Sequence, residues 1–195
     1  MKNQAKVKAF KLAGLLIGCQ LPTNQGGHAG RAVENLLRNM GVPINIGKGA
    51  DMLVYGLELK TRKISATSPQ TVATMSAVDI ISTPYRLSSI YGKFQQQLRI
   101  YTNDLDVIVR AEVVDFDQKH IQDLVSEGYE YARNQIITNP GIKHTSYSGG
   151  HWGYFEQCHL PQSSAYSFRF SDTDMYKLED MAKSTFGSIF DYEIA

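Results

Sequence analysis

The sequence contains two cysteines and no apolar run long enough to cross a bilayer. Cys19 and Cys158 form neither a metal-ligand spacing nor a disulfide framework, so we expect both to pack in the core of a protein in a reducing cytoplasm. The most apolar stretch, residues 12–19, is interrupted by two glycines and is not followed by a small-residue cleavage site. It follows four lysines, which leaves a signal peptide as the minor alternative. We therefore expect a cytoplasmic protein that does not bind membranes.

Acidic residues are also scarce in the first third of the chain. Residues 1–63 hold three, Glu34, Asp51 and Glu58, against ten Lys and Arg, a net charge of +7. The rest of the chain holds ten basic and sixteen acidic residues, a net charge of −6. A basic segment suits a polyanionic partner such as nucleic acid. The three carboxylates in this segment are therefore candidates for chemistry.

Helical and strand-like segments alternate along the chain, which predicts an α/β protein. Helices are expected over residues 6–18, 30–40, 117–137 and 172–189, with Gly41 ending the second helix and Asp172 capping the last. Strands are expected over residues 50–64 (two strands around Gly56), 71–78, 97–102, 105–114, 154–159 and 166–170, with a hairpin turn at Asn103-Asp104. A chain of 195 residues fits one domain, or one domain with two lobes.

Two of the scarce carboxylates lie in residues 51–60, which read Asp, six residues, Glu, one residue, Lys. Glu58 and Lys60 are two residues apart, so on a strand their side chains leave the same face. Carboxylates at Asp51 and Glu58 suit Mg²⁺, of which one or two ions can assist phosphodiester hydrolysis. Lys60 would then orient or deprotonate the attacking water. The spacing is typical of metal-dependent nucleases.

Two neighbouring features extend this candidate site. Leu59 points into the core, and its backbone carbonyl is a further candidate ligand. Glu34, on the preceding helix, is a candidate third carboxylate. The alternative is a solvated strand with a Glu58–Lys60 ion pair, and a Glu34 that lies on a helix surface, because short patterns of this kind also arise by chance.

A second pattern accompanies the first. Residues 27–34 follow G-x-x-G-x-x-[aliphatic]-E, and residues 51–61 follow D-x6-E-L-K-T with Gly56 two residues before Glu58. In this order the two segments resemble the motifs of the MutH family, in the PD-(D/E)xK nuclease superfamily. That family comprises the mismatch-repair nicking endonuclease MutH and related type II restriction enzymes that cut at GATC. The order of elements in residues 117–189 loosely resembles the family's second half.

The resemblance implies a restriction-endonuclease-like α/β core, with a central mixed β-sheet flanked by helices and two lobes around a DNA cleft. It implies one nuclease domain over residues 1–195, with a catalytic lobe over 1–115 and a DNA-recognition lobe over 116–195. It assigns catalysis to Glu34, Asp51, Glu58 and Lys60, and Mg²⁺ binding to Asp51, Glu58, Glu34 and the Leu59 carbonyl. The expected DNA contacts are His28, Arg31, Lys48, Arg62, Lys63, Lys93, His159, Tyr166 and Arg169.

The chain departs from the family at two places. Gly26 stands where the family usually has Lys, and either His28 or Lys48 would replace that charge. The family's base-reading strand ends in an Arg-Pro-Lys-like segment, whereas residues 157–161 here read Gln-Cys-His-Leu-Pro. Because Arg is the usual reader of guanine and His is a different donor, the resemblance does not carry the GATC target to this chain.

The sequence thus predicts a Mg²⁺-dependent, sequence-specific endonuclease of double-stranded DNA. We favour a type II restriction enzyme, which cuts both strands as a homodimer, as a transient dimer or by sequential nicking. Three alternatives stay open: a MutH-type repair nicking enzyme, a structure-specific junction resolvase, and a non-catalytic DNA-binding or interaction module with a degenerate nuclease core.

Overall fold

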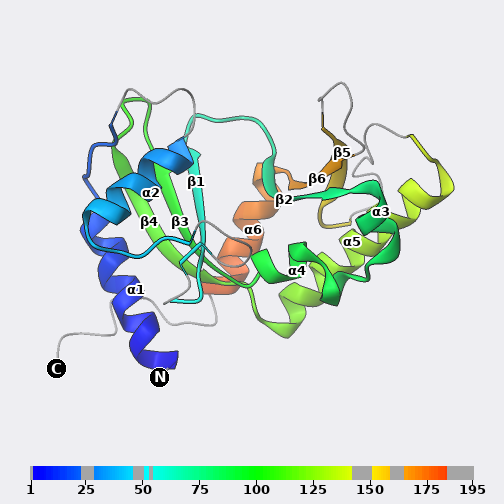
Figure 1. The fold of residues 1–195 in the computed structure, drawn as a ribbon, viewed down its shortest axis with the longest axis horizontal. Coiled ribbons are helices and arrows are strands. Elements are labelled where there is room, and N and C mark those ends of the chain that lie inside the picture. The colour runs from blue at the N-terminus through cyan, green and yellow to red at the C-terminus, as the bar shows by residue number, and fades with distance from the viewer. Residues whose placement is uncertain are drawn as a thin grey trace. The chain divides into compact units, whose positions relative to one another are not determined.

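The structure is a computed structural model that describes residues 2–22, 29–45, 51–52, 55–141, 151–158 and 165–183. The chain divides into two compact units, Met1–Thr67 with Gln95–Asp115 and Ser68–Phe94 with Phe116–Ala195. Within the described residues, each unit contains one three-stranded sheet and its own helices (Figure 1). The protein is therefore α/β, with two separate sheets where the sequence predicted a single central one.

The first unit holds a mixed sheet of β1 (Glu58–Lys63), β3 (Gln96–Thr102) and β4 (Ile108–Asp115), in the order β1-β3-β4. β1 runs parallel to β3, and β3 runs antiparallel to β4. The β3–β4 turn is closed by Asn103, whose N–H donates to the Val107 carbonyl at 3.0 Å and whose Oδ1 accepts from the Leu105 N–H at 3.0 Å. The hairpin expected at Asn103-Asp104 is thus confirmed.

Two helices, α1 (Lys2–Leu16) and α2 (Ala29–Asn39), cover one face of this sheet, with α1 against β4 and α2 against β1 (Figure 1). The buried side chains of α1 recur at helical spacing: Ala9, Leu12, Ala13 and Leu16. They join apolar side chains of the sheet, among them Leu59, Leu98 and Ile100, in one core cluster. Because side chains alternate along a strand, Glu58, Lys60, Gln97 and Arg99 occupy the opposite face.

The end of α2 follows from its sequence. Gly41 has a φ of +78°, and its N–H donates to the Arg38 carbonyl at 2.9 Å. The next residue, Val42, donates its N–H to the Leu37 carbonyl at 2.9 Å and buries its side chain. This pair of bonds is the Schellman motif, in which glycine takes the left-handed position without strain. The prediction that Gly41 ends the helix is confirmed.

The second unit holds an antiparallel sheet of β2 (Gln70–Ser76), β6 (Ala165–Phe170) and β5 (Tyr154–Gln157), in the order β2-β6-β5. Its helical segments are α3 (Ala77–Ser82), η1 (Tyr85–Leu87), α4 (Ser89–Lys93), α5 (Lys119–Thr138) and α6 (Asp172–Lys183). Tyr129 of α5 packs edge-on against Phe155 and Phe168 of the sheet. These aromatic contacts fix the long helix on the sheet.

Ser171, rather than Asp172, caps the start of α6. The Ser171 Oγ accepts the Asp174 N–H at 3.1 Å, and the Ser171 carbonyl accepts the Met175 N–H at 3.0 Å. Asp172 is the first helical residue, where its negative charge suits the positive end of the helix dipole. The expected cap is therefore one residue too late.

A buried amide ties α5 to two separate chain segments of the second unit. The Gln122 Nε2 donates to the backbone carbonyls of Phe94 at 2.6 Å and Phe116 at 2.9 Å. The Gln122 Oε1 accepts the Tyr85 hydroxyl at 2.7 Å. Phe94 and Phe116 also stack on each other, with ring centroids 4.5 Å apart. One side chain thus satisfies three polar groups inside an apolar core.

Residues 68–94 pack with the second unit because β2 pairs with β6, with Gln70 opposite Phe170. The division at residue 115 expected from the sequence placed this segment in the first lobe. The assignment of catalysis to one lobe and DNA recognition to the other stays a prediction.

Among the described residues, no helix is long and apolar enough to cross a membrane. Cys19 and Cys158 are free thiols and only partly buried, so neither is a full member of a core.

Candidate active site

A tight turn brings Asp51 to the start of β1. Met52 and Leu57 bridge each other, with N–H to carbonyl distances of 2.9 and 3.3 Å. Gly56 lies in the turn between them with a φ of +66°, a conformation that favours glycine. The chain reverses, and the Leu59 N–H donates to the Asp51 Oδ2 at 3.0 Å. The six-residue spacing between Asp51 and Glu58 is compatible with this reversal. Of the first strand expected in residues 50–64, the described residues form the Met52–Leu57 bridge, and residues 50, 53 and 54 lie outside the described residues.

Glu58 and Lys60 meet on one face of β1. The Lys60 Nζ lies 2.9 Å from the Glu58 Oε1, as expected for residues two apart on a strand. The Glu58 side chain is 2% exposed and that of Lys60 is 24% exposed, while Leu59 between them is buried in the core. A buried carboxylate costs several kcal/mol to desolvate unless it is well partnered. A solvated ion pair therefore does not describe Glu58.

The backbone of Leu59 faces Asp51. Within its sheet β1 is an edge strand, and Ile64, which directly follows it, donates its N–H to the Thr102 carbonyl at 2.8 Å. Even-numbered residues of β1 therefore bond to β3, whereas the Leu59 N–H is directed to Asp51. The N–H and C=O of one strand residue point to the same side, so the Leu59 carbonyl shares that edge with Asp51.

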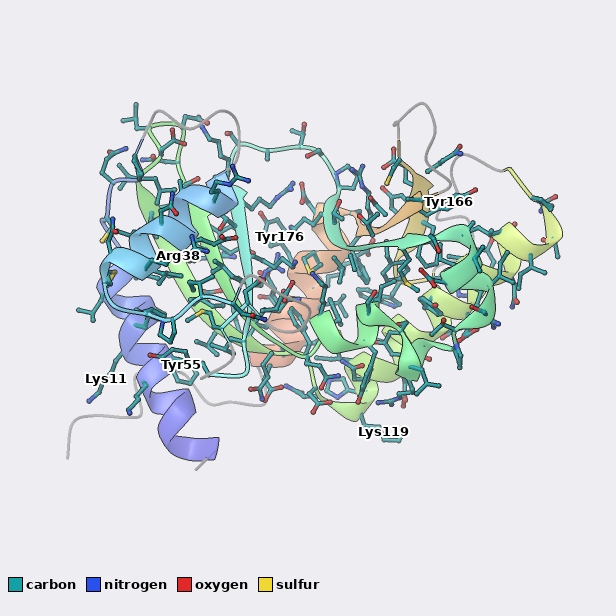
Figure 2. The ribbon with its side chains drawn as sticks, viewed as in Figure 1. Lys11, Arg38, Tyr55, Lys119, Tyr166 and Tyr176 are labelled. Carbon is teal, nitrogen blue, oxygen red and sulfur yellow. The ribbon has the colours of Figure 1, made fainter. Side chains whose placement is uncertain are left out.

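Glu34 does not join the other carboxylates in one cluster. It lies on α2, where its Oε2 pairs with the Nη2 of Arg38 at 3.2 Å (Arg38 is labelled in Figure 2). Within the described ranges, no group of three or more His, Cys, Asp and Glu residues is placed to hold a metal ion. The role of Glu34 as a metal ligand stays a prediction.

The donor set at Asp51, Glu58 and the Leu59 carbonyl fits Mg²⁺. All three donors are hard oxygens, and Mg²⁺ in proteins commonly binds through one or two carboxylates while keeping several waters. That no third carboxylate joins them among the described residues therefore does not argue against this ion.

The same sheet face continues onto β3 with polar residues that belong to neither sequence motif. Gln97 is the ladder partner of Glu58, and Arg99 is the ladder partner of Lys60. The Arg99 Nη1 donates to the Gln97 Oε1 at 2.8 Å, and the Arg99 Nε donates to the Tyr101 hydroxyl at 3.2 Å. The signal was present in residues 97–101, where polar side chains alternate with Leu98 and Ile100.

The expected DNA-contacting residues of the first unit lie in different places. Arg62 shares the face of Glu58 and Lys60, and its Nη2 donates to the Ala66 carbonyl at 2.8 Å. Lys63 leaves the opposite face and pairs with Asp106 at 2.9 Å. Arg31 is exposed on α2. Of these three residues, only Arg62 lies on the same face of β1 as Glu58 and Lys60.

In the second unit, Lys93 is the last residue of α4. Tyr166, labelled in Figure 2, is buried on β6, where it shares the face of the core residue Phe168. Arg169 lies on the other face of β6, bonded to Glu156 and, through its Nε, to the Thr71 hydroxyl at 3.1 Å. His28, Lys48 and His159 lie outside the described residues.

No protein-family model matches this chain, and no curated protein matches its sequence. The resemblance to the MutH family therefore stays a prediction that rests on residues 27–61.

Proposed function

We propose that this chain is a Mg²⁺-dependent endonuclease of double-stranded DNA with a restriction-endonuclease-like core. One observation carries the proposal: the Leu59 N–H donates to the Asp51 carboxylate, and the side chains of the two residues that flank Leu59, Glu58 and Lys60, lie 2.9 Å apart on one face of β1. Two carboxylates and an amine thus lie on or beside residues 58–60 of β1. They do so in a segment that is otherwise strongly basic, where carboxylates are scarce.

Each residue has a role that its chemistry allows. Asp51, Glu58 and the Leu59 carbonyl hold the ion, and Glu34 is an auxiliary acid on α2. Bound Mg²⁺ neutralises charge on the phosphate and lowers the pKa of water. Lys60, held beside Glu58 by their 2.9 Å contact, orients the attacking water or donates to a nonbridging phosphate oxygen.

The substrate follows from charge. The net +7 of residues 1–63 favours a polyanion, and Arg62 adds a guanidinium on the face of the acidic pair. Arg31, Lys63, Lys93 and Arg169 are further candidate phosphate or base contacts. We favour a type II restriction enzyme because residues 157–161 match poorly the Arg-Pro-Lys-like segment that ends the base-reading strand in the MutH family.

The test uses long unmethylated plasmid DNA with Mg²⁺ or with EDTA, followed by sequencing of the ends. Wild-type protein is expected to give discrete Mg²⁺-dependent fragments with a shared end sequence. Asp51→Asn is expected to abolish cleavage while DNA binding is kept or strengthened, because a negative charge near phosphate is removed. Asp104→Asn, which changes an exposed loop carboxylate of the same unit, is the matched control and should cleave normally.

The other outcomes separate the alternatives. Nicked circles without linear product would favour a repair nicking enzyme, and cleavage confined to branched DNA would favour a junction resolvase. A folded wild-type protein that cleaves none of these substrates in Mg²⁺ would contradict the proposal and favour a non-catalytic module. Asp51→Asn with wild-type activity would contradict the site assignment.

A further inference from the structure

A cleft of about 340 Å³ opens on the second unit, where residues of β2, α3, η1 and α4 come together (Figure 1). All of its described lining residues belong to that unit, and none of them is a proposed metal ligand. Pockets for small molecules commonly measure about 300–1,000 Å³, so this cleft is large enough for one small ligand.

The polar lining of the cleft accepts hydrogen bonds. Asp79 on α3 is exposed, and its Oδ2 accepts the Ser76 hydroxyl at 2.7 Å. Among the described residues, its Oδ1 has no hydrogen-bond partner, and neither do the Thr83 and Ser89 hydroxyls in the same lining. A carboxylate only accepts, whereas a hydroxyl donates or accepts. The cleft is therefore suited to a ligand that carries N–H donors.

The charges in and around the cleft favour a neutral group inside and an anion outside. The Asp79 carboxylate repels a phosphate or a carboxylate in the cleft, and no Lys or Arg is among the described lining residues. Arg86 directly precedes the lining residue Leu87 and is exposed, with its guanidinium 5.0 Å from the centre of the Tyr91 ring. A nucleotide has this distribution of charge, since its base is neutral and its phosphate is not.

From this arrangement we infer that the cleft binds an extrahelical nucleobase with an exocyclic amino group, adenine or cytosine, and that Asp79 accepts a hydrogen bond from that group. Met75 and Leu87 supply apolar contacts for the base. Leu87 is 78% exposed, and an exposed leucine can insert between base steps and fill the space that a flipped base leaves. The inference rests on the DNA binding of the proposed function and adds Asp79 as a specificity-determining residue.

The test isolates the amino group of the base. Two duplexes each leave one base unpaired opposite an abasic site, because an unpaired base leaves the stack at low cost. That base is cytosine in one duplex and uracil in the other, which carry an amino group and a carbonyl, respectively, at C4. Binding is measured in EDTA, which prevents Mg²⁺-dependent cleavage, so the result does not depend on catalysis.

Wild type is expected to bind the cytosine duplex about tenfold more tightly than the uracil duplex, because the Asp79 carboxylate accepts from an amino group and repels a carbonyl. Asp79→Asn should bring the two affinities within about twofold, since an amide can present either its oxygen or its NH₂ to the base. The amide can still accept the Ser76 hydroxyl, which protects the start of α3. Leu87→Ala should weaken binding of both duplexes and keep their ratio. Asp123→Asn, which changes an exposed carboxylate of α5 outside the cleft, is the matched control and should keep the wild-type ratio.

Three results would overturn the inference and leave the nuclease proposal standing. The first is equal binding of the two duplexes by wild type, and the second is an unchanged preference for cytosine in folded Asp79→Asn. The third is an equal loss of the preference in Asp79→Asn and Asp123→Asn, which would mean that the preference follows net charge rather than the cleft. A wild-type protein that binds neither duplex would overturn this inference together with the DNA binding on which the proposed function depends.

Discussion

Replacement of Lys60 by Met is expected to destabilise the protein far more than replacement of Glu58 by Gln. Glu58 is 2% exposed and its contact with the Lys60 ammonium is 2.9 Å long. Removal of one partner of a buried ion pair costs about 3–5 kcal/mol, because the other charge is left uncompensated. Because Lys60 is 24% exposed, water can partly replace its ammonium group. We therefore expect Lys60→Met to lower the free energy of unfolding by about 3 kcal/mol.

Replacement of Glu58 instead of Lys60 leaves a positive charge rather than a negative one. Glu58→Gln keeps the shape of the side chain and leaves the partly exposed ammonium of Lys60 to water, so we expect a loss of about 1 kcal/mol. The double variant Glu58→Gln/Lys60→Met removes both charges. It should therefore be more stable than Lys60→Met alone, with a coupling free energy of about 2 kcal/mol.

The assay is urea unfolding in EDTA and in Mg²⁺. Lys63→Met is the matched control, because the pair of Lys63 and Asp106 is also 2.9 Å long but both side chains are about one-third exposed. Such exposed pairs contribute about 0–1 kcal/mol. Mg²⁺ at a hundredfold excess over its Kd should stabilise wild type by about 2.7 kcal/mol, and should stabilise Glu58→Gln much less. A Lys60→Met cost no larger than that of Lys63→Met would refute the reasoning about the buried carboxylate.

Two further predictions concern the second unit. Gln122→Leu should lower the free energy of unfolding by about 3 kcal/mol in urea titrations, because two backbone carbonyls and a hydroxyl lose a buried partner; a loss under about 1 kcal/mol would contradict this account. Burial raises the pKa of Tyr129 to about 12, from about 10 in the unfolded chain. Between these values only the unfolded state loses its phenolic proton, so stability should fall by about 1–3 kcal/mol as pH rises from 10 to 12. Tyr129→Phe should make that decline shallower, and an unchanged slope would contradict the assignment.

Features set by local chemistry were predictable from the sequence. Gly41 ends α2 because a left-handed residue follows the last turn, and the turn at Asn103 closes by bonds within five residues. The placement of Asp51 beside β1 is also local, because the turn around Gly56 sets it. That Asp51, Glu58 and Lys60 lie near one another could therefore be predicted before any fold was known, and their catalytic role stays a prediction.

Features set by distant pairing were not predictable. β2 pairs with β6, which lies far along the chain, and nothing in residues 70–76 indicates that partner. Gln97 and Arg99 alternate with apolar residues, so the sequence predicted a strand with a polar face. Their position beside Glu58 and Lys60 depends on the parallel register of β1 and β3, which no local signal specifies.

The N-cap residue of α6 is another feature that the sequence alone did not determine. Ser171 and Asp172 are adjacent and both residue types favour the N-cap position, so composition alone does not choose between them. The choice follows from the bonds that Ser171 makes to Asp174 and Met175.

The most direct test of the central claim is cleavage of supercoiled plasmid DNA by purified wild type and Asp51→Asn, each in Mg²⁺ and in EDTA. The account predicts cleavage by wild type in Mg²⁺ alone, and none by Asp51→Asn in either condition. Equal cleavage by both proteins, or cleavage by wild type in EDTA, would contradict a metal-dependent centre built on Asp51, Glu58 and Lys60.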